Sequence, residues 1–271
     1  MVKSKTRSMI GVLILVAIFL IAPTNALTAG ASKSVLQSSA PPPIPCCGGG
    51  SNIYWGVDSV DDMFSQNPTL LSQVQSQLGS PGIIGRYLND GGTLLTSTET
   101  SKLIGDGIAL VLYYSPANTA LTGTGTADTE STQAVAEAKN VGAMPHTGVA
   151  IYRDMEPPPL GYTINSAYIT RWYQDLSSAG YTAGFYEDSY SGPFENQFCA
   201  ASANAIANTF LQTPQLQQPQ DGYTEAAAPT TYNPYHVACE SLSQMMGWQY
   251  LEGDLSPHVD VDEYSITGTY E

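Results

Sequence analysis

Short apolar runs alternate with amphipathic segments along most of this chain, and this alternation limits the folds open to it more than any other feature. The spacing predicts strands at 53–59, 82–88, 108–115, 148–156 and 183–189. It predicts helices at 67–78, 97–106, 128–141, 165–179 and 194–208. Strands that alternate with helices in this way predict a parallel sheet covered by crossover helices.

The rhythm changes after residue 208. The segment 210–234 is rich in Gln, Pro and Thr and has no clear assignment, whereas 247–251 and 259–266 predict two closing strands with little helix between them. Five βα units followed by helix-poor strands predict an α/β fold, an irregular TIM-type (β/α) barrel. An open doubly wound sheet is the alternative. It would usually carry a G-x-G-x-x-G turn after the first strand, and GVDSVDDM is not such a turn.

The N-terminus has the pattern of an export signal. Lys3, Lys5 and Arg7 precede the apolar run 9–22, which is shorter than the ~20 residues that span a bilayer. With Thr24 and Ala26 at the −3 and −1 positions, the pattern predicts a signal peptide over 1–26 and a secreted or cell-surface protein. A retained membrane anchor is the alternative. Residues 27–51 predict a flexible leader, and 52–271 a single barrel domain.

The charge balance limits the partners. The sequence carries 9 Lys and Arg against 24 Asp and Glu, a formal net charge of −15. Binding to phosphate groups needs clustered Lys and Arg, so nucleic acids and anionic lipid surfaces are poor candidates. After signal cleavage we expect no stable membrane insertion, and we expect a monomer.

Four cysteines are present: Cys46, Cys47, Cys199 and Cys239. A secreted protein permits disulfides, and Cys199 and Cys239 both fall within the predicted domain, so we expect this pair, although four cysteines allow three connectivities. No C-x-x-C pairs recur and the histidines are scattered, so no metal or cofactor is expected. The carboxylates around Asp58 and around Asp260 leave a divalent-cation site as the alternative.

Acidic residues recur at the ends of the predicted strands. Asp58 closes the first strand, Asp154 and Glu156 close the fourth, and Asp260 lies in the last. In a β/α barrel the carboxyl ends of the strands build the active site. Carboxylates gathered there repel each other, so one should hold a proton near neutral pH, and a protonated carboxyl beside an ionised one can split a glycosidic bond. Solvated loop acids on an acidic protein are the alternative.

Five short motifs occur in a fixed order: GVDS at 56–59, D-x-E at 154–156, FY at 185–186, WQY at 248–250 and VDVD at 259–262. In this order the sequence resembles glycoside hydrolase family 25, the secreted lysozymes of bacteria and phages. It is still more similar to the bacterial glycoside-hydrolase-like domains of unknown function, which also carry GRY, here 85–87, in the second strand. The resemblance extends from residue 53 to the C-terminus. It implies a barrel of five βα units closed by three strands, with a deep acidic groove.

The resemblance also implies a reaction and catalytic residues. It implies hydrolysis of glycosidic bonds in peptidoglycan or a related N-acetylhexosamine polymer. Glu156 would be the general acid/base, and Asp154 would stabilise positive charge or orient a substrate acetamido group. Asp58 and Asp260 would set the electrostatics and hold substrate or water.

Four further residues are candidates for binding the polysaccharide. Tyr186 and Trp248 would stack on sugar rings. Asp262 shares a strand face with Asp260 and is a weaker match to the family position. Arg86 would contact substrate, or it would form an ion pair with an acid at the barrel mouth.

Three features depart from the family pattern. Arg153 directly precedes Asp154, where an aliphatic residue is more usual, and its side chain is expected on the opposite face. Prolines 157–159 follow the D-x-E motif, and the long segment 212–235 has no clear counterpart. These departures favour the alternative function, a non-catalytic carbohydrate- or cell-wall-binding protein on the same barrel.

Overall fold

The computed structural model describes residues 53–89, 93–117, 119–155, 162–187, 192–214, 234, 237–239, 245–251 and 259–265. The predicted signal peptide and leader lie outside these ranges, and so does Glu156. Within the described ranges, no helix is long and apolar enough to cross a membrane.

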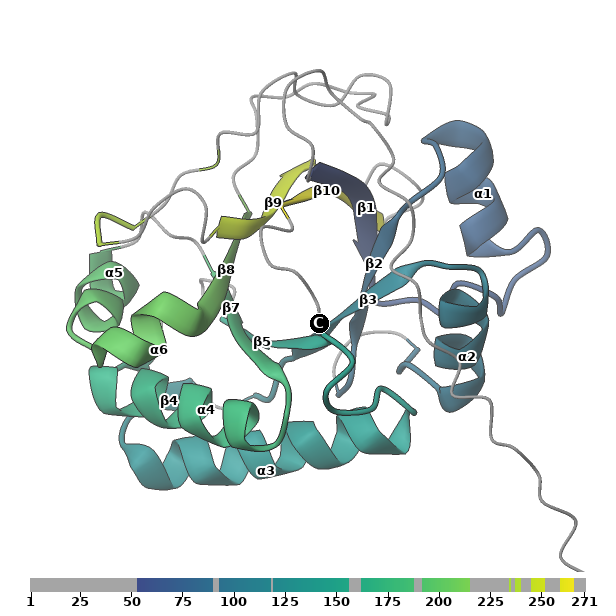
Figure 1. Ribbon diagram of the computed structural model, residues 1–271. Coiled ribbons are helices and arrows are strands. Elements are labelled where there is room, and N and C mark those ends of the chain that lie inside the picture. Colours follow the sequence, from purple (N-terminus) through teal and green to yellow (C-terminus); the bar gives the residue numbers. More distant parts are fainter. Residues whose placement is uncertain are drawn as a thin grey trace, which may run out of the picture. The chain divides into compact units, whose positions relative to one another are not determined.

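Eight strands close into a barrel in the order β1-β10-β9-β8-β7-β5-β3-β2 (Figure 1). They are β1 Ile53–Ser59, β2 Ile83–Tyr87, β3 Ala109–Tyr114, β5 Ala150–Asp154, β7 Thr182–Tyr186, β8 Thr209–Pro214, β9 Met245–Leu251 and β10 Val259–Ser265. Neighbouring strands are parallel, except that β10 runs antiparallel to both β9 and β1. The predicted irregular TIM-type barrel is confirmed, and the doubly wound alternative is wrong because the sheet closes on itself.

Six helices lie around the outside of the described barrel in Figure 1. They are α1 Leu70–Gln77, α2 Ser97–Gly105, α3 Thr124–Asn140, α4 Ser166–Ser178, α5 Gly192–Cys199 and α6 Ala203–Asn208. The predicted helix 194–208 is thus two helices. Two short strands, β4 Ala120–Leu121 and β6 Thr163–Ile164, form a separate parallel pair that the sequence did not predict.

Side-chain caps explain where several helices begin. Thr96 accepts a hydrogen bond from the backbone N–H of Glu99, and Asn165 accepts one from that of Tyr168. Such caps satisfy N–H groups that have no partner within the helix. Helix α3 begins at Thr124, four residues before its predicted start, because Gly123 takes the cap position.

Strand β8 begins at Thr209 and continues into the segment that the sequence left unassigned. Leu211 packs in the hydrophobic core, while the next side chain, Gln212, is buried inside the barrel. A strand whose inner face is polar lacks the apolar run by which the other strands are recognised. This strand supplies the third closing strand that the resemblance implies.

The buried residues form two layers. The outer layer lies between the strands and the helices and includes the fully buried Trp55, Trp172 and Trp248. The inner layer lies in the lumen, the interior enclosed by the strands, and is rich in tyrosine: Tyr87, Tyr113, Tyr152, Tyr186 and Tyr264. The barrel therefore has an apolar outer core and a lumen lined with hydroxyl groups.

A disulfide joins Cys199 at the end of α5 to Cys239. The predicted pairing is confirmed. The bond links positions 40 residues apart in the sequence. It ties residues 237–239 to the carboxyl end of α5.

Candidate functional site at the carboxyl end of the barrel

Glycines on the inner face of the barrel make room for the polar side chains of the lumen. A Cβ added at Gly85 would lie 2.5 Å from the Tyr113 ring and 2.6 Å from Asp58 Cβ. A Cβ at Gly56 would lie 2.8 Å from the Tyr264 ring. Two further glycines provide the same clearance: Gly184 for Tyr152, and Gly247 for Gln212.

The closure of the barrel brings three acids together. Asp58 on β1 lies opposite Asp260 on β10, and Asp262 lies opposite Gly56, two residues deeper along the lumen. Asp58 is 2% exposed and Asp262 is fully buried, whereas Asp260 is half-buried. The sequence placed Asp58 and Asp260 at the mouth and gave Asp262 a lesser role, but Asp262 is the central member of this group.

Asp262 belongs to a buried cluster of hydrogen-bonded side chains. Its Oδ1 accepts from Gln212 Nε2 at 3.1 Å, and its Oδ2 accepts from the Tyr264 hydroxyl at 3.1 Å. The Tyr113 hydroxyl donates to Gln212 Oε1 at 2.8 Å and lies 3.2 Å from the Tyr264 hydroxyl. A further hydrogen bond joins Asp262 to Asp58. Four strands therefore contribute to one buried polar cluster.

The pKa of Asp262 is raised to about 7, chiefly by burial. The negative charge of Asp260 contributes to the rise, while hydrogen bonds from Asp58, Tyr264 and Gln212 oppose it. Burial also raises the pKa of Tyr113 and of Tyr264 well above the ordinary value, so both hydroxyls keep their protons. Asp262, hydrogen-bonded to Asp58, therefore keeps its proton up to about neutral pH.

Asp154 lies on the other side of the lumen. It ends β5, two residues after the lumen-facing Tyr152, and is 6% exposed. Strands β3 and β2 separate β5 from β1, so Asp154 faces the Asp58–Asp262 pair across the barrel. Its predicted partner Glu156 lies outside the described residues.

The two predicted stacking residues have different surroundings. Tyr186 faces the lumen, and its hydroxyl donates to Gln249 Oε1. Trp248 faces the opposite side of β9 and is fully buried in the outer core against Tyr250. The sugar-stacking role predicted for Trp248 does not fit this position, since the ring presents no face to the lumen.

Arg86 also lies outside the lumen. Its Nε donates to Glu99 on α2 at 2.8 Å, and its other nitrogens donate to the backbone oxygens of Ser59 and Thr93. Both side chains of this ion pair are buried. Of the two alternatives for Arg86, the ion pair is therefore correct, but its partner is a helix residue instead of a mouth acid. The pair anchors the segments that follow β1 and precede α2.

A second buried ion pair supports Asp154 from behind. Arg153 donates to Glu130 on α3 at 2.9 Å and to the backbone oxygen of Asp154. Arg153 thus points away from the lumen, as predicted. Arg153 departs from the family pattern, but its side chain does not enter the lumen. It holds the backbone of Asp154 in place.

The site includes residues that sequence reasoning missed: Tyr113, Gln212, Gln249 and Tyr264. The two tyrosines could have been found, because each lies two positions from a lumen-facing residue on its own strand. Gln212 could not, since β8 gave no strand signal, whereas Gln249 lies within the predicted strand 247–251 and alternates there with Trp248 and Tyr250.

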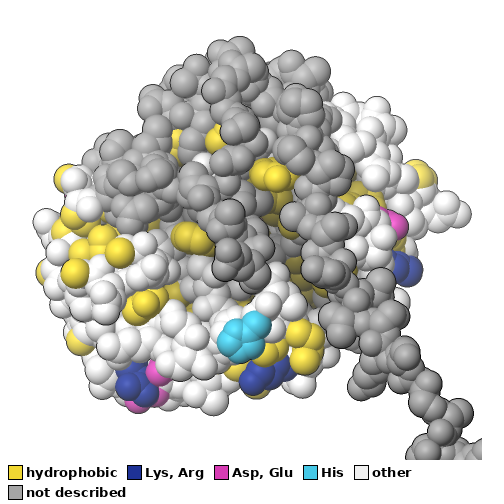
Figure 2. All heavy atoms as spheres, viewed as in Figure 1, with side chains coloured by type: hydrophobic (Ala, Val, Ile, Leu, Met, Phe, Trp, Pro, Cys, Tyr) yellow, Lys and Arg dark blue, Asp and Glu magenta, His cyan; other side chains and the backbone are white. Residues whose placement is uncertain are grey.

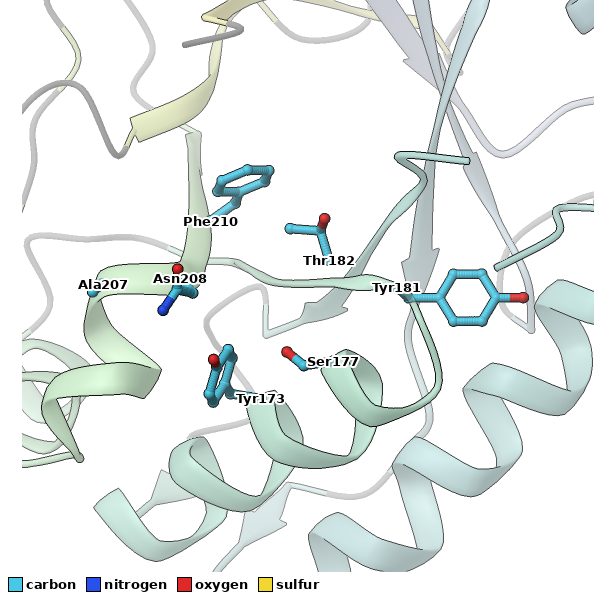
Figure 3. A pocket seen from close by; sticks show the side chains of 7 residues that line it. All are labelled: Tyr173, Ser177, Tyr181, Thr182, Ala207, Asn208 and Phe210. Carbon is cyan, nitrogen blue, oxygen red and sulfur yellow. The ribbon is translucent and has the colours of Figure 1, made fainter. Parts of the chain in front are cut away.

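A surface cavity of about 320 Å³ is the pocket shown in Figure 3. It is lined by Tyr173, Ser177, Tyr181, Thr182, Ala207, Asn208 and Phe210. Thr182 starts β7 and Phe210 lies near the start of β8, so the cavity is at the amino end of the barrel, away from the acids. In Figure 3 the Tyr181 ring points away from the other side chains, and its hydroxyl donates to the Ala143 carbonyl.

On the face shown in Figure 2, the acidic and basic side chains of the described residues are few and scattered. Among the described residues, no group of three or more His, Cys, Asp or Glu could hold a metal ion.

Comparison with known proteins identifies relatives across most of the barrel. Residues 80–266 match the family described as the Rv2525c-like, glycoside hydrolase-like domain. The crystal structure of an uncharacterized B. stearothermophilus protein has a TM-score of 0.67 and 23% identity, over 79% of this chain and 96% of that chain.

Two further structures are similar at lower levels. The Tat-secreted protein Rv2525c of Mycobacterium tuberculosis, in complex with L-tartrate, has a TM-score of 0.51 and 13% identity, over 80% of this chain and 99% of that chain. The modular autolysin LytC of Streptococcus pneumoniae has a TM-score of 0.48 and 14% identity, over 80% of this chain and 47% of that chain. No protein of curated function matches.

Proposed function

This chain belongs to the Rv2525c-like, glycoside hydrolase-like family, and we propose that it is a secreted glycoside hydrolase. The observation that carries the proposal is the buried Asp262, which is hydrogen-bonded to Asp58 near the carboxyl end of the barrel strands and has a pKa raised to about 7. β/α-barrel enzymes carry out their chemistry at that end. A carboxyl that keeps its proton at neutral pH beside ionised ones supports acid–base cleavage of a glycosidic bond.

The catalytic assignment follows the motif resemblance. Glu156 is the proposed general acid/base, and Asp154 stabilises the positive charge that develops at the sugar ring. Asp58 and Asp260 hold substrate or water from the opposite side of the lumen. The buried Arg153–Glu130 pair supports this assignment, because it fixes the backbone of Asp154.

The proposed substrate is peptidoglycan or another polymer of N-acetylhexosamine, since the motifs resemble those of lysozymes. Tyr186, at the carboxyl end of β7, is the proposed sugar contact. An extracellular location is supported by the predicted signal peptide and by the Cys199–Cys239 disulfide, because such bonds persist in oxidising compartments.

One observation favours a second candidate function, glycan binding without cleavage. Asp58, Asp154 and Asp262 are nearly or fully buried, and the Asp262 carboxylate receives donors at both oxygens. A satisfied and buried carboxyl can serve as a structural polar core as well as a catalytic one. On this account the barrel would recognise cell-wall glycan and release no product.

The test is reducing-end release from purified peptidoglycan and from chitin oligomers between pH ~4 and ~8. We expect release by the wild type, and a loss of about 100-fold or more in Asp154→Asn if this carboxylate stabilises the transition state. Asp128→Asn is the matched control, since Asp128 is an exposed acid on α3 that pairs with Arg171. Saturable glycan binding with no release would support the second candidate. Neither release nor binding would refute both.

A further inference from the structure

The cavity at the amino end of the barrel has no part in the proposed reaction. Its volume of about 320 Å³ falls at the lower end of the range of ~300–1,000 Å³ that is usual for small-molecule sites. Strand β7 begins at Thr182 in the cavity wall and ends at Tyr186 near the acids. At ~3.3 Å per residue, this strand separates the two by about 13 Å. A ligand held in the cavity would therefore leave the acids unoccupied.

Four elements of the fold bring the lining side chains together. Tyr173 and Ser177 lie four residues apart on α4, so they project from one face of that helix. Asn208 ends α6, while Thr182 and Phe210 lie near the starts of β7 and β8, which pair in parallel. In Figure 3 these five side chains lie around one space. The walls of the cavity therefore come mainly from helices and strands, whose positions the barrel fixes.

Two aromatic rings in the cavity are anchored and yet accessible. Tyr173 packs against the outer core, and Phe210 packs against the inner layer of the lumen. Both residues are only half-buried, so part of each remains open to a ligand. Because this packing holds the rings in place beforehand, little conformational entropy is lost when a ligand packs on them.

The polar groups of the cavity are all neutral. Ser177 and Thr182 supply hydroxyls that can donate or accept a hydrogen bond. Asn208 is exposed, and its Nδ2 donates to the backbone oxygen of Asn204 at 3.0 Å, which leaves the amide oxygen as an acceptor. Among the described residues that line the cavity, none carries a charged side chain. The cavity therefore offers neutral donors and acceptors beside aromatic rings.

This combination selects for one chemical class of ligand. A pyranose sugar has C–H groups on its ring faces, which pack on aromatic rings, and hydroxyls around its edge, which need donors and acceptors. An anionic or cationic ligand would lose its hydration here without gaining an oppositely charged partner. A wholly apolar ligand would bury the hydroxyls and the amide oxygen without partners, at a cost in free energy.

We propose that the amino-end cavity is a second, non-catalytic sugar site, which takes one ring of a neutral glycan. Tyr173 and Phe210 supply the apolar contacts, while Ser177, Thr182 and Asn208 bond the ring hydroxyls. This inference goes beyond the proposed function, because binding at this end requires no cleavage at the other. A site here attaches the barrel to a glycan and leaves the carboxyl end open.

The experiment is an NMR titration of the full secreted chain labelled with ¹⁵N. The probes are N-acetylglucosamine, which is neutral, and glucuronate, a pyranose of similar size with a carboxylate. We expect N-acetylglucosamine to shift the backbone amide signals of Ser177, Thr182 and Asn208 in a saturable way. Glucuronate should bind this site about fivefold or more weakly, since its charge finds no partner there.

Two variants test the cavity itself. Ser177→Trp fills the space from an exposed helix position and should weaken binding of N-acetylglucosamine by about tenfold or more. Ser178→Trp is the matched control, because it adds the same ring at the next exposed position of α4, which does not line the cavity. Tyr173→Ala removes one aromatic contact and should weaken binding by about fivefold. Gln174→Ala, at the neighbouring exposed position, should leave binding unchanged.

Three results would overturn the proposal: no saturable shift at the amino end, equal binding of the two probes there, or full affinity in both Ser177→Trp and Tyr173→Ala. The outcome is separate from that of the proposed function. Sugar shifts confined to Asp58, Asp154 and Tyr186 would contradict the second site and leave the proposed hydrolase standing. Binding at the amino end by a chain that releases no reducing ends would confirm the second site and count against the hydrolase.

Discussion

Asp58 and Asp262 are hydrogen-bonded to each other although they lie on the first and last strands of the barrel. Strand β10 runs antiparallel to β1 and places Asp262 opposite Gly56, whose missing side chain leaves space for the Tyr264 ring. The pair therefore exists only once the barrel has closed. The polar centre of the lumen depends on the pairing of β1 with β10.

The raised pKa of Asp262 predicts stability that falls with rising pH. The pKa is about 7 in the folded state against an ordinary 3.8, so the folded chain keeps a proton that the unfolded chain releases. Stability from this group is therefore complete below pH ~4 and is lost progressively up to pH ~7, by at most about 4 kcal/mol. Asp262→Asn should flatten the dependence of the urea-unfolding free energy on pH between pH ~4 and pH ~7.

The control for this prediction is Asp128→Asn, which removes an exposed acid on α3. It should keep the wild-type slope against pH. An Asp262→Asn protein with the same slope as the wild type would show that Asp262 is ionised throughout the range.

Gly85→Ala should destabilise the barrel and disturb the site. The new methyl group would meet the Tyr113 ring and Asp58 Cβ at distances that real side chains do not tolerate. Overpacking of this kind costs about 1–3 kcal/mol. Chemical denaturation measures the loss. Gly125→Ala in α3 meets nothing within 4 Å and should be neutral or stabilising by up to ~1 kcal/mol. Equal effects of the two changes would argue against a crowded lumen at Gly85.

Arg86→Met should cost about 3–5 kcal/mol, because it leaves the buried Glu99 carboxylate without its partner. Arg171→Met is the comparison, since Arg171 pairs with Asp128 and Asp175 on the surface. Water and salt screen such exposed pairs, so its effect on the unfolding free energy should be much smaller. A small effect of Arg86→Met would mean that Glu99 takes up a proton or finds another donor.

Loss of the Cys199–Cys239 disulfide should lower stability by about 4 kcal/mol, the value that chain entropy gives for a closure of this size. The double change Cys199→Ser with Cys239→Ser, compared with the wild type under oxidising conditions, measures it. Changing Cys46 and Cys47 to Ser should leave the unfolding midpoint in place. An unchanged midpoint in the first variant would show that the unfolded chain is already constrained.

The sequence predicted the barrel because most of its strands have an apolar outer face. Strands such as β3, with Leu110, Leu112 and Tyr114 on the outside, carry a signal that needs no tertiary information. Strand β8 carries no such signal, since Gln212 and Thr213 are buried and polar. Its place in the fold follows from pairing with β7 and β9, and local sequence cannot show that.

The site was predicted only in part, for a related reason. Strand alternation places Asp58 and Asp260 on the lumen face from the sequence alone. It places Asp262 there too, but depth and burial decide that Asp262 has the raised pKa, and both depend on closure against β1. Arg86 and Trp248 were assigned by their positions in the motifs. The outer face of β2 instead places Arg86 beside Glu99, and the outer face of β9 places Trp248 in the outer core.

The most direct test of the account is reducing-end release from peptidoglycan by the wild type and by Glu156→Gln, purified side by side and matched for unfolding midpoint. If the barrel is a glycoside hydrolase with Glu156 as its acid/base, the wild type will release reducing ends and the variant will lose about 100-fold or more of that activity. Equal release by both proteins, or none by a folded wild type that still binds the glycan, would contradict it.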